Sequence, residues 1–161
     1  MKVFIIYLTL GLIFLTFQTT LLQTLLPSGL IPDIPLVMIF YLGFHRGSMD
    51  GLITSFSLGC LADIFSGGIV GVTPLSFISI FVMVYFMAKR VVFHSLLTKI
   101  GGTTAFALLK GGIVYLILMG LTSNPEIPFL TVIVPSAVLT GMISPAIFNL
   151  LDRVENLYQN E

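Results

Sequence analysis

The chain has 161 residues, of which 57% are hydrophobic and only 9% are charged, and its mean hydropathy is +1.10. Soluble domains carry roughly one-quarter charged residues, so this composition excludes an ordinary soluble enzyme or binding domain. The formal net charge is zero and no basic or acidic block is present, which argues against a nucleic-acid partner. The sequence therefore predicts an all-α, polytopic membrane protein that forms a single domain over residues 1–161.

Six apolar segments follow one another along the chain, each bounded by turn or polar residues, and a bilayer crossing takes about 20 helical residues. They predict transmembrane helices at residues 3–26, 30–44, 49–66, 69–88, 101–121 and 127–151. The second is short for a span and depends on bilayer thinning or on cover by protein. A cleaved signal peptide is not expected, because the first stretch is too long and no small-residue cleavage site follows it. Pro135 and Pro145 are expected to kink the last helix.

Lysine and arginine fall on one side of this predicted topology. With the N-terminus inside, the inner segments carry Lys2, Arg46, Lys89, Arg90, Lys99 and Arg153. The outer loops carry Asp33 and Glu126 and no lysine or arginine. Because cytoplasmic loops collect these cations, the pattern predicts that both termini lie inside.

Small residues form one face of the third predicted helix. They recur at every fourth position: Gly47, Gly51, Ser55, Gly59 and, at its end, Asp63. A second row lies on the last predicted helix beside Gly141: Ser136, Thr140 and Ser144. In lipid, small residues allow close backbone approach and hydroxyls bond across helices, so each row predicts a contact seam. Either seam could serve packing within the bundle or docking of a partner helix.

Asp63 and Lys110 lie at least one helical turn inside predicted spans, where a charge is costly unless it is paired. Asp63 could cap the start of the next helix, or it could line an outward polar pocket with Gln18, Gln23 and Thr73. Lys110 lies near the middle of its helix, about 15 Å from either membrane surface. The nearest plausible counter-ion is Asp63, although it should lie roughly 10 Å nearer the outer face, so a pair would need tilt or a bridging water. An Asp63–Lys110 pair is our hypothesis.

Signatures of catalysis and of metal or cofactor binding are missing. The sequence has no HExxH, no GxSxG and no Walker loop. Neither His45 nor His94 has a companion at ligand spacing, and Cys60 is the only cysteine. We therefore expect a protein that is not an enzyme and has no metal or cofactor.

Residues 32–77, PDIPLVMIFYLGFHRGSMDGLITSFSLGCLADIFSGGIVGVTPLSF, resemble the bacterial rod shape-determining protein MreD family. The likeness rests on a proline-led second helix, the basic turn at His45 and Arg46, a glycine-striped helix that leads to LADIFSG, and the following Gly71. The chain length, the six predicted spans and the inside N-terminus also agree with that family. We do not match Lys110 to the family pattern, and its interpretation rests on its own charge and depth in the helix.

The resemblance implies a non-enzymatic subunit of the elongation machinery in the bacterial inner membrane, which supports side-wall peptidoglycan synthesis and cell shape. It implies MreC as the main partner, with MreB, RodA, a class B penicillin-binding protein and membrane lipid around it. The family is also similar in fold to the substrate-binding membrane subunits of energy-coupling-factor vitamin transporters.

Our hypothesis is that the six-helix body grips the membrane helix of MreC along one small-residue seam. The candidate partner-binding or structural polar residues are Asp63, Lys110, Gly51, Ser55, Gly59, Gly141 and Arg46. Gly59→Leu or Gly141→Leu should then abolish co-purification with MreC and leave the protein inserted. The alternatives are a small-molecule-binding subunit of a vitamin-type transporter and a proton-linked carrier that uses Asp63 and Lys110.

Overall fold

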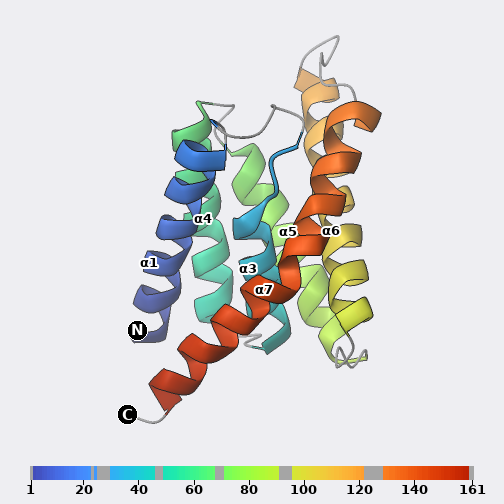
Figure 1. The fold of residues 1–161 in the computed structure, drawn as a ribbon. Helices are drawn as coiled ribbons and strands as arrows, with labels where there is room; N and C mark the ends of the chain where they lie inside the picture. The colour runs from blue at the N-terminus through green and yellow to red at the C-terminus, as the bar shows by residue number, and fades with distance from the viewer. Residues whose placement is uncertain are drawn as a thin grey trace.

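The computed structural model describes residues 2–22, 24, 30–45, 49–67, 71–90, 96–121 and 129–159. These residues are helical except for 30–33 and the turn residues 67, 71, 89 and 90, and they contain no β-strand. The six α-helices are α1 (Lys2–Phe17), α3 (Ile34–His45), α4 (Met49–Ser66), α5 (Val72–Ala88), α6 (Leu96–Leu121) and α7 (Val134–Gln159). Two π-helical segments adjoin them, η1 (Gln18–Leu22) after α1 and η2 (Phe129–Ile133) before α7. Successive helices run in alternating directions, so α1 begins and α7 ends at the same end of the bundle (Figure 1). We call this the terminal end and the opposite one the far end.

The six predicted helices are confirmed as helices, and two of them are long and apolar enough to cross a membrane. These two stretches are Leu96–Gly120 in α6 and Thr131–Asn156 in η2 and α7. Helix α3 has 12 residues, about 18 Å of helix, which is shorter than a hydrocarbon core of about 30 Å. Six membrane crossings therefore stay a prediction. The predicted start of the second helix at residue 30 is wrong, because residues 30–33 are extended and α3 begins at Ile34.

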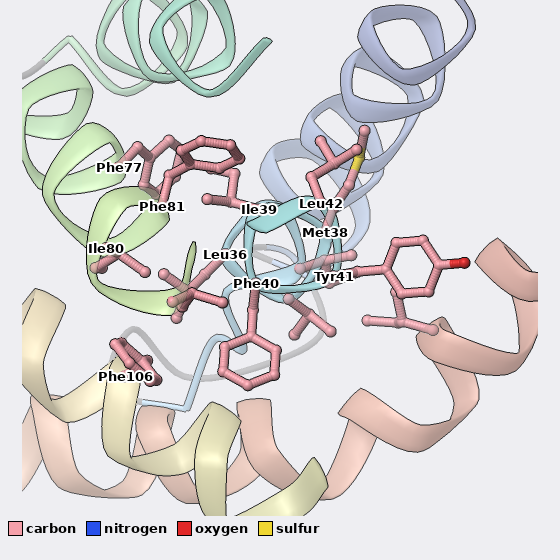
Figure 2. Packing of buried hydrophobic residues seen from close by; sticks show 14 of the residues in the cluster. Leu36, Met38, Ile39, Phe40, Tyr41, Leu42, Phe77, Ile80, Phe81 and Phe106 are labelled. Atoms are coloured by element: carbon pink, nitrogen blue, oxygen red, sulfur yellow. The ribbon is translucent and has the colours of Figure 1, made fainter. Parts of the chain in front are cut away.

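The shortest helix, α3, lies at the centre of the bundle and contacts each of the other five. All ten residues from Ile34 to Gly43 are buried. Figure 2 shows its side chains directed outward in several directions, with Phe40 facing Phe106 of α6 and with Phe77 and Phe81 of α5 on another side. The Phe40 ring lies 5.4 Å from the Phe106 ring, in a tilted arrangement that aromatic pairs favour. A helix covered on every side must be apolar on every side, which explains the unbroken apolar sequence of this segment.

The stripe of small residues on α4 faces the interior of the bundle. Gly51, Ser55 and Gly59 are all buried. A Cβ atom at Gly59 would overlap the backbone of Pro74 in α5. The predicted seam therefore exists, but α5 of the same protein packs against it. The prediction that this seam docks a partner helix is wrong.

Gly141 has the same role between α7 and α6. A Cβ atom there would overlap the Thr104 side chain and lie 3.0 Å from the carbonyl oxygen of Ile100. Three residues further along α7, Ser144 is buried and its hydroxyl oxygen lies 2.9 Å from that of Thr103. This second seam, too, is an internal one, which corrects its assignment as a possible partner interface.

Two prolines mark irregular places in the last helical stretch. Pro135 has no amide hydrogen to donate to the carbonyl of Thr131, and the π-helical η2 ends directly before the turn that contains it. Pro145 lies inside α7. Figure 1 shows α7 following α6 in its first half and diverging from it in the second, toward the terminal end.

The glycine contacts predict which substitutions the fold tolerates. Gly59→Leu and Gly141→Leu should each lower the free energy of unfolding by about 1–3 kcal/mol or more, because the new side chain meets a neighbouring helix. Gly112→Leu is the matched control, because nothing lies within 4 Å of the position that its Cβ would take. Thermal unfolding in detergent measures the effect, and equal unfolding temperatures for all three variants would contradict the packing.

Candidate functional site around Asp33 and Lys110

Residues 30–33 carry the chain from the far end into the bundle before α3 begins (Figure 1). Two side chains of α7 hold this extended stretch. The hydroxyl of Ser136 donates to the carbonyl of Ile31 (2.6 Å), and the amide of Asp33 donates to the hydroxyl oxygen of Thr140 (2.9 Å). These bonds satisfy backbone groups that have no helical partner, which allows a non-helical segment to lie against α7.

Asp33 ends this stretch and caps α3. Its Oδ1 accepts a hydrogen bond from the amide of Leu36 (3.2 Å), as an N-cap carboxylate does. The amide of Ile34, which starts the helix and has no carbonyl partner within it, donates to Oε1 of Gln18 in η1 (3.2 Å). Pro35 lies in the first turn, where its missing amide leaves no bond unmade. The start of α3 is thus fixed by side chains from its own cap and from η1.

The second oxygen of the Asp33 carboxylate forms an ion pair with Nζ of Lys110. Lys110 lies on α6, and its ammonium also lies 4.6 Å from the centre of the Phe77 ring of α5. The side chains of Lys110 and Asp33 are only 19% and 18% exposed. Each charge therefore compensates the other in largely apolar surroundings, and removal of one partner of such a pair costs about 3–5 kcal/mol.

The hypothesis that Lys110 pairs with Asp63 is wrong. The Asp63 side chain is 3% exposed, and its Oδ2 accepts a hydrogen bond from the amide of Gly71 (2.7 Å) directly before α5. Gly71 has a φ of 106°, a left-handed conformation that glycine adopts without strain. Asp63 thus ties the end of α4 to Gly71 at the start of α5, which is the capping role that we considered for it. Of the other residues of the outward pocket that we considered, Gln18 accepts a hydrogen bond from the amide of Ile34 in α3, and Gln23 lies outside the described residues, so that pocket stays a prediction.

A partly open cavity of about 240 Å³ lies beside the ion pair, between α6, η2 and α7. Asp33 and Lys110 line it together with Ser136 and Thr140. Gly111 and Tyr115 also line it, and the rest of its wall is aliphatic: Ala107, Val114, Val132, Ile133 and Ala137. The cavity thus combines one charged pair and hydroxyl groups with an apolar wall, which is the usual composition of a small-molecule site.

A second polar cluster lies near the terminal end. The hydroxyl oxygen of Tyr41 lies 2.8 Å from Oδ1 of Asp152 and 2.6 Å from Oε2 of Glu155. The ring of His45 stacks on that of Tyr41, with 4.2 Å between their centres. These contacts join the end of α3 to the polar last turns of α7, which continue as helix to Gln159.

The predicted site residues do not come together in one place. Asp63 bonds to Gly71 before α5, the small residues belong to the internal seams, and Arg46 lies outside the described residues. Sequence reasoning missed Asp33 as the partner of Lys110 and the position of residues 30–33 against the hydroxyl row of α7. One signal pointed to Asp33: an aspartate directly before an apolar helix, with proline in the first turn, is an N-cap pattern.

Substitution of the pair tests it directly. Asp33→Asn keeps a good N-cap and removes the charge, so it should destabilise the protein by about 3–5 kcal/mol, as should Lys110→Met. The double variant should recover most of this loss, because neither charge is then left alone. Asp63→Asn combined with Lys110→Met should be additive. Denaturant or thermal unfolding in detergent measures these four effects and that of Asp63→Asn alone, and additivity for Asp33 and Lys110 would contradict the pair.

Comparison with known proteins identifies a family for this chain. The family model of the rod shape-determining protein MreD matches residues 1–154. Comparisons with curated proteins and with solved structures gave no match, so the likeness to energy-coupling-factor subunits stays a prediction. The match extends over almost the whole chain, including α6 and α7, which carry Lys110 and its hydroxyl neighbours. The chain belongs to the MreD family of rod shape-determining proteins.

Proposed function

We propose that the protein is a non-enzymatic scaffold of the rod-shape machinery in the bacterial cytoplasmic membrane, where it binds the membrane helix of MreC. Family membership carries the role in rod shape. As a scaffold, the protein holds MreC in position for side-wall peptidoglycan synthesis. Through MreC it also positions RodA, MreB and a class B penicillin-binding protein. The chemistry then belongs to the partners.

The outer surface of the bundle favours a membrane around all six helices. Large apolar side chains stand exposed on five of them, including Ile5, Ile13, Ile64, Leu75, Leu97, Leu116 and Met142. Such a surface is unfavourable in water and suits lipid. Lys89 and Arg90 follow α5 at the terminal end, where α1 begins, and this agrees with a cytoplasmic location of that end.

The interior supports a structural use of the polar groups. Among the described residues, every buried side-chain nitrogen or oxygen has a hydrogen-bond partner. Asp33, Asp63 and Lys110 are each engaged in holding a helix start or a helix pair. A rigid body with its polar groups engaged in this way suits a protein that positions other helices.

Some glycines pack against another helix of the protein and others do not, and this difference indicates where a partner helix would lie. Gly59 and Gly141 are filled by the chain itself, whereas at Gly101, Gly112 and Gly120 of α6 nothing lies within 4 Å of the place that a Cβ would occupy. Ala105 is exposed on the same face. A glycine destabilises a helix, and one without a packed neighbour gains no contact that offsets this loss. A partner helix that packs against it would supply such a contact. This outward face of α6 is the proposed interface with MreC.

The interface predicts a selective loss of binding. Gly112→Leu should leave the protein inserted and folded, yet reduce the MreC recovered with the tagged protein by about tenfold, because the side chain blocks close approach. Ser79→Leu, on the exposed surface of α5, is the matched control and should retain MreC. Affinity purification from native membranes with quantitative mass spectrometry measures both. Normal recovery of MreC with Gly112→Leu would move the interface elsewhere.

A second candidate function is a small-molecule-binding subunit of a vitamin-type transporter. The cavity beside Asp33 and Lys110 favours it, since an apolar pocket with a few polar groups can hold a small solute. The same purification separates the two functions. An ATPase module and a stoichiometric solute in place of MreC would support the transporter.

A further inference from the structure

The cavity beside the ion pair lies on the inner side of α6, away from the outward face of that helix. Residues 107, 110, 111 and 114 line it, whereas residues 105, 109, 112 and 116 lie on the opposite side. A ligand in the cavity would therefore not compete with a helix on the outward face. Binding in this cavity goes beyond the scaffold function and does not depend on it.

The charges of the cavity select the net charge of a ligand. The charges of Asp33 and Lys110 cancel and lie in direct contact. A charged ligand beside them would be attracted by one of the two and repelled by the other. Such an ion would also lose its hydration in largely apolar surroundings, without a net opposite charge to compensate. These surroundings favour a ligand that is neutral overall.

The hydrogen-bonding groups select its polar head. An ammonium has three N–H donors, and Lys110 directs one to Asp33 while its charge also lies over the Phe77 ring. The Asp33 carboxylate accepts from the amide of Leu36 and from Lys110, and a carboxylate has about four lone-pair sites. A donor and an acceptor therefore lie side by side at the edge of the cavity. A hydroxyl, which donates one hydrogen and accepts others, matches this arrangement.

The wall and the volume select the rest of the ligand. Ala107, Val114, Val132, Ile133 and Ala137 offer an aliphatic surface, and Tyr115 adds an aromatic ring with a hydroxyl, so the wall carries no further charge. The volume of about 240 Å³ exceeds the roughly 150 Å³ in which an apolar cavity can hold a benzene ring. We propose that this cavity binds a net-neutral amphiphile with a hydroxyl head and a compact apolar body, whose head accepts a hydrogen bond from Lys110 and donates one to Asp33.

The probe for this site is para-fluorobenzyl alcohol, followed by fluorine NMR on the full-length protein in lipid nanodiscs, with empty nanodiscs as the partition control. The alcohol should bind saturably. Para-fluorotoluene, which lacks the head, and the ions para-fluorobenzoate and para-fluorobenzylammonium should each bind at least about tenfold more weakly. Equal binding of all four probes, or a signal that matches empty nanodiscs, would overturn the proposal.

Two substitutions from opposite walls locate the binding. Val114→Phe on α6 and Val132→Phe on η2 each fill the cavity and should weaken alcohol binding by at least about tenfold. Leu116→Phe adds the same ring to the exposed side of α6 and should leave binding unchanged. The double variant Asp33→Asn/Lys110→Met should remove the preference for the alcohol over the toluene. Unchanged binding in both filled variants would place the probe elsewhere and overturn the site.

The ligand could reach the cavity from the aqueous phase or from the membrane. Mass spectrometry of protein extracted from native membranes distinguishes these sources. A co-purified neutral lipid that the probe displaces identifies a membrane source, and saturation from the aqueous phase without such a lipid identifies a solute. Either result supports the site, provided that the filled variants lose it.

Discussion

Compensation of the Lys110 charge inside an apolar bundle is the constraint on which the rest of the structure depends. The ammonium lies on α6 beside a ring of α5, and the carboxylate of Asp33 is the group that neutralises it. For Asp33 to reach that position, the chain must enter the bundle before α3 begins. The extended stretch, its two hydroxyl partners on α7 and the short length of α3 all follow from this requirement.

Close packing around α3 is the second constraint. A central helix that touches every other helix leaves little room, so small residues appear where two of its neighbours must approach each other. Gly59 allows this between α4 and α5, and Gly141 between α7 and α6. In lipid, where apolar surface gains little by leaving the solvent, such contacts and buried hydroxyl pairs stabilise a bundle. The glycines of α6 that have no such neighbour are the ones at which we propose that a partner helix packs.

Much of this arrangement could be predicted from the sequence, and the reasons for the failures are physical. Apolar runs and their bounding turns predicted six helices, and the small-residue rows predicted seams. The capping role considered for Asp63 proved to be its role in the structure. The row at Ser136, Thr140 and Ser144 predicted bonds to neighbouring segments, and the structure contains them.

The errors arose where position along the chain does not give depth in the bundle. Asp33 follows a proline and precedes an apolar run, so it resembles a loop residue at the membrane surface. Only the tertiary contacts of residues 30–33 reveal that it lies level with Lys110. Periodicity likewise predicts that Gly59 and Gly141 lie on close-packed faces, but it cannot identify the helix that packs there. The number of membrane crossings stays a prediction, since α3 is too short for its length alone to show whether it spans a bilayer.

The course of residues 30–33 along α7 can be tested most directly by cross-linking in native membranes. With Cys60→Ser as background, Ile31→Cys and Ser136→Cys place two thiols at positions that a hydrogen bond of 2.6 Å joins in the structure. A short bifunctional thiol reagent should link them within one chain, and digestion with mass spectrometry should recover the linked peptides, which neither single-cysteine variant yields. If both thiols react singly and no link forms, residues 30–33 lie outside the bundle, and the ion pair between Asp33 and Lys110 cannot be the basis of this fold.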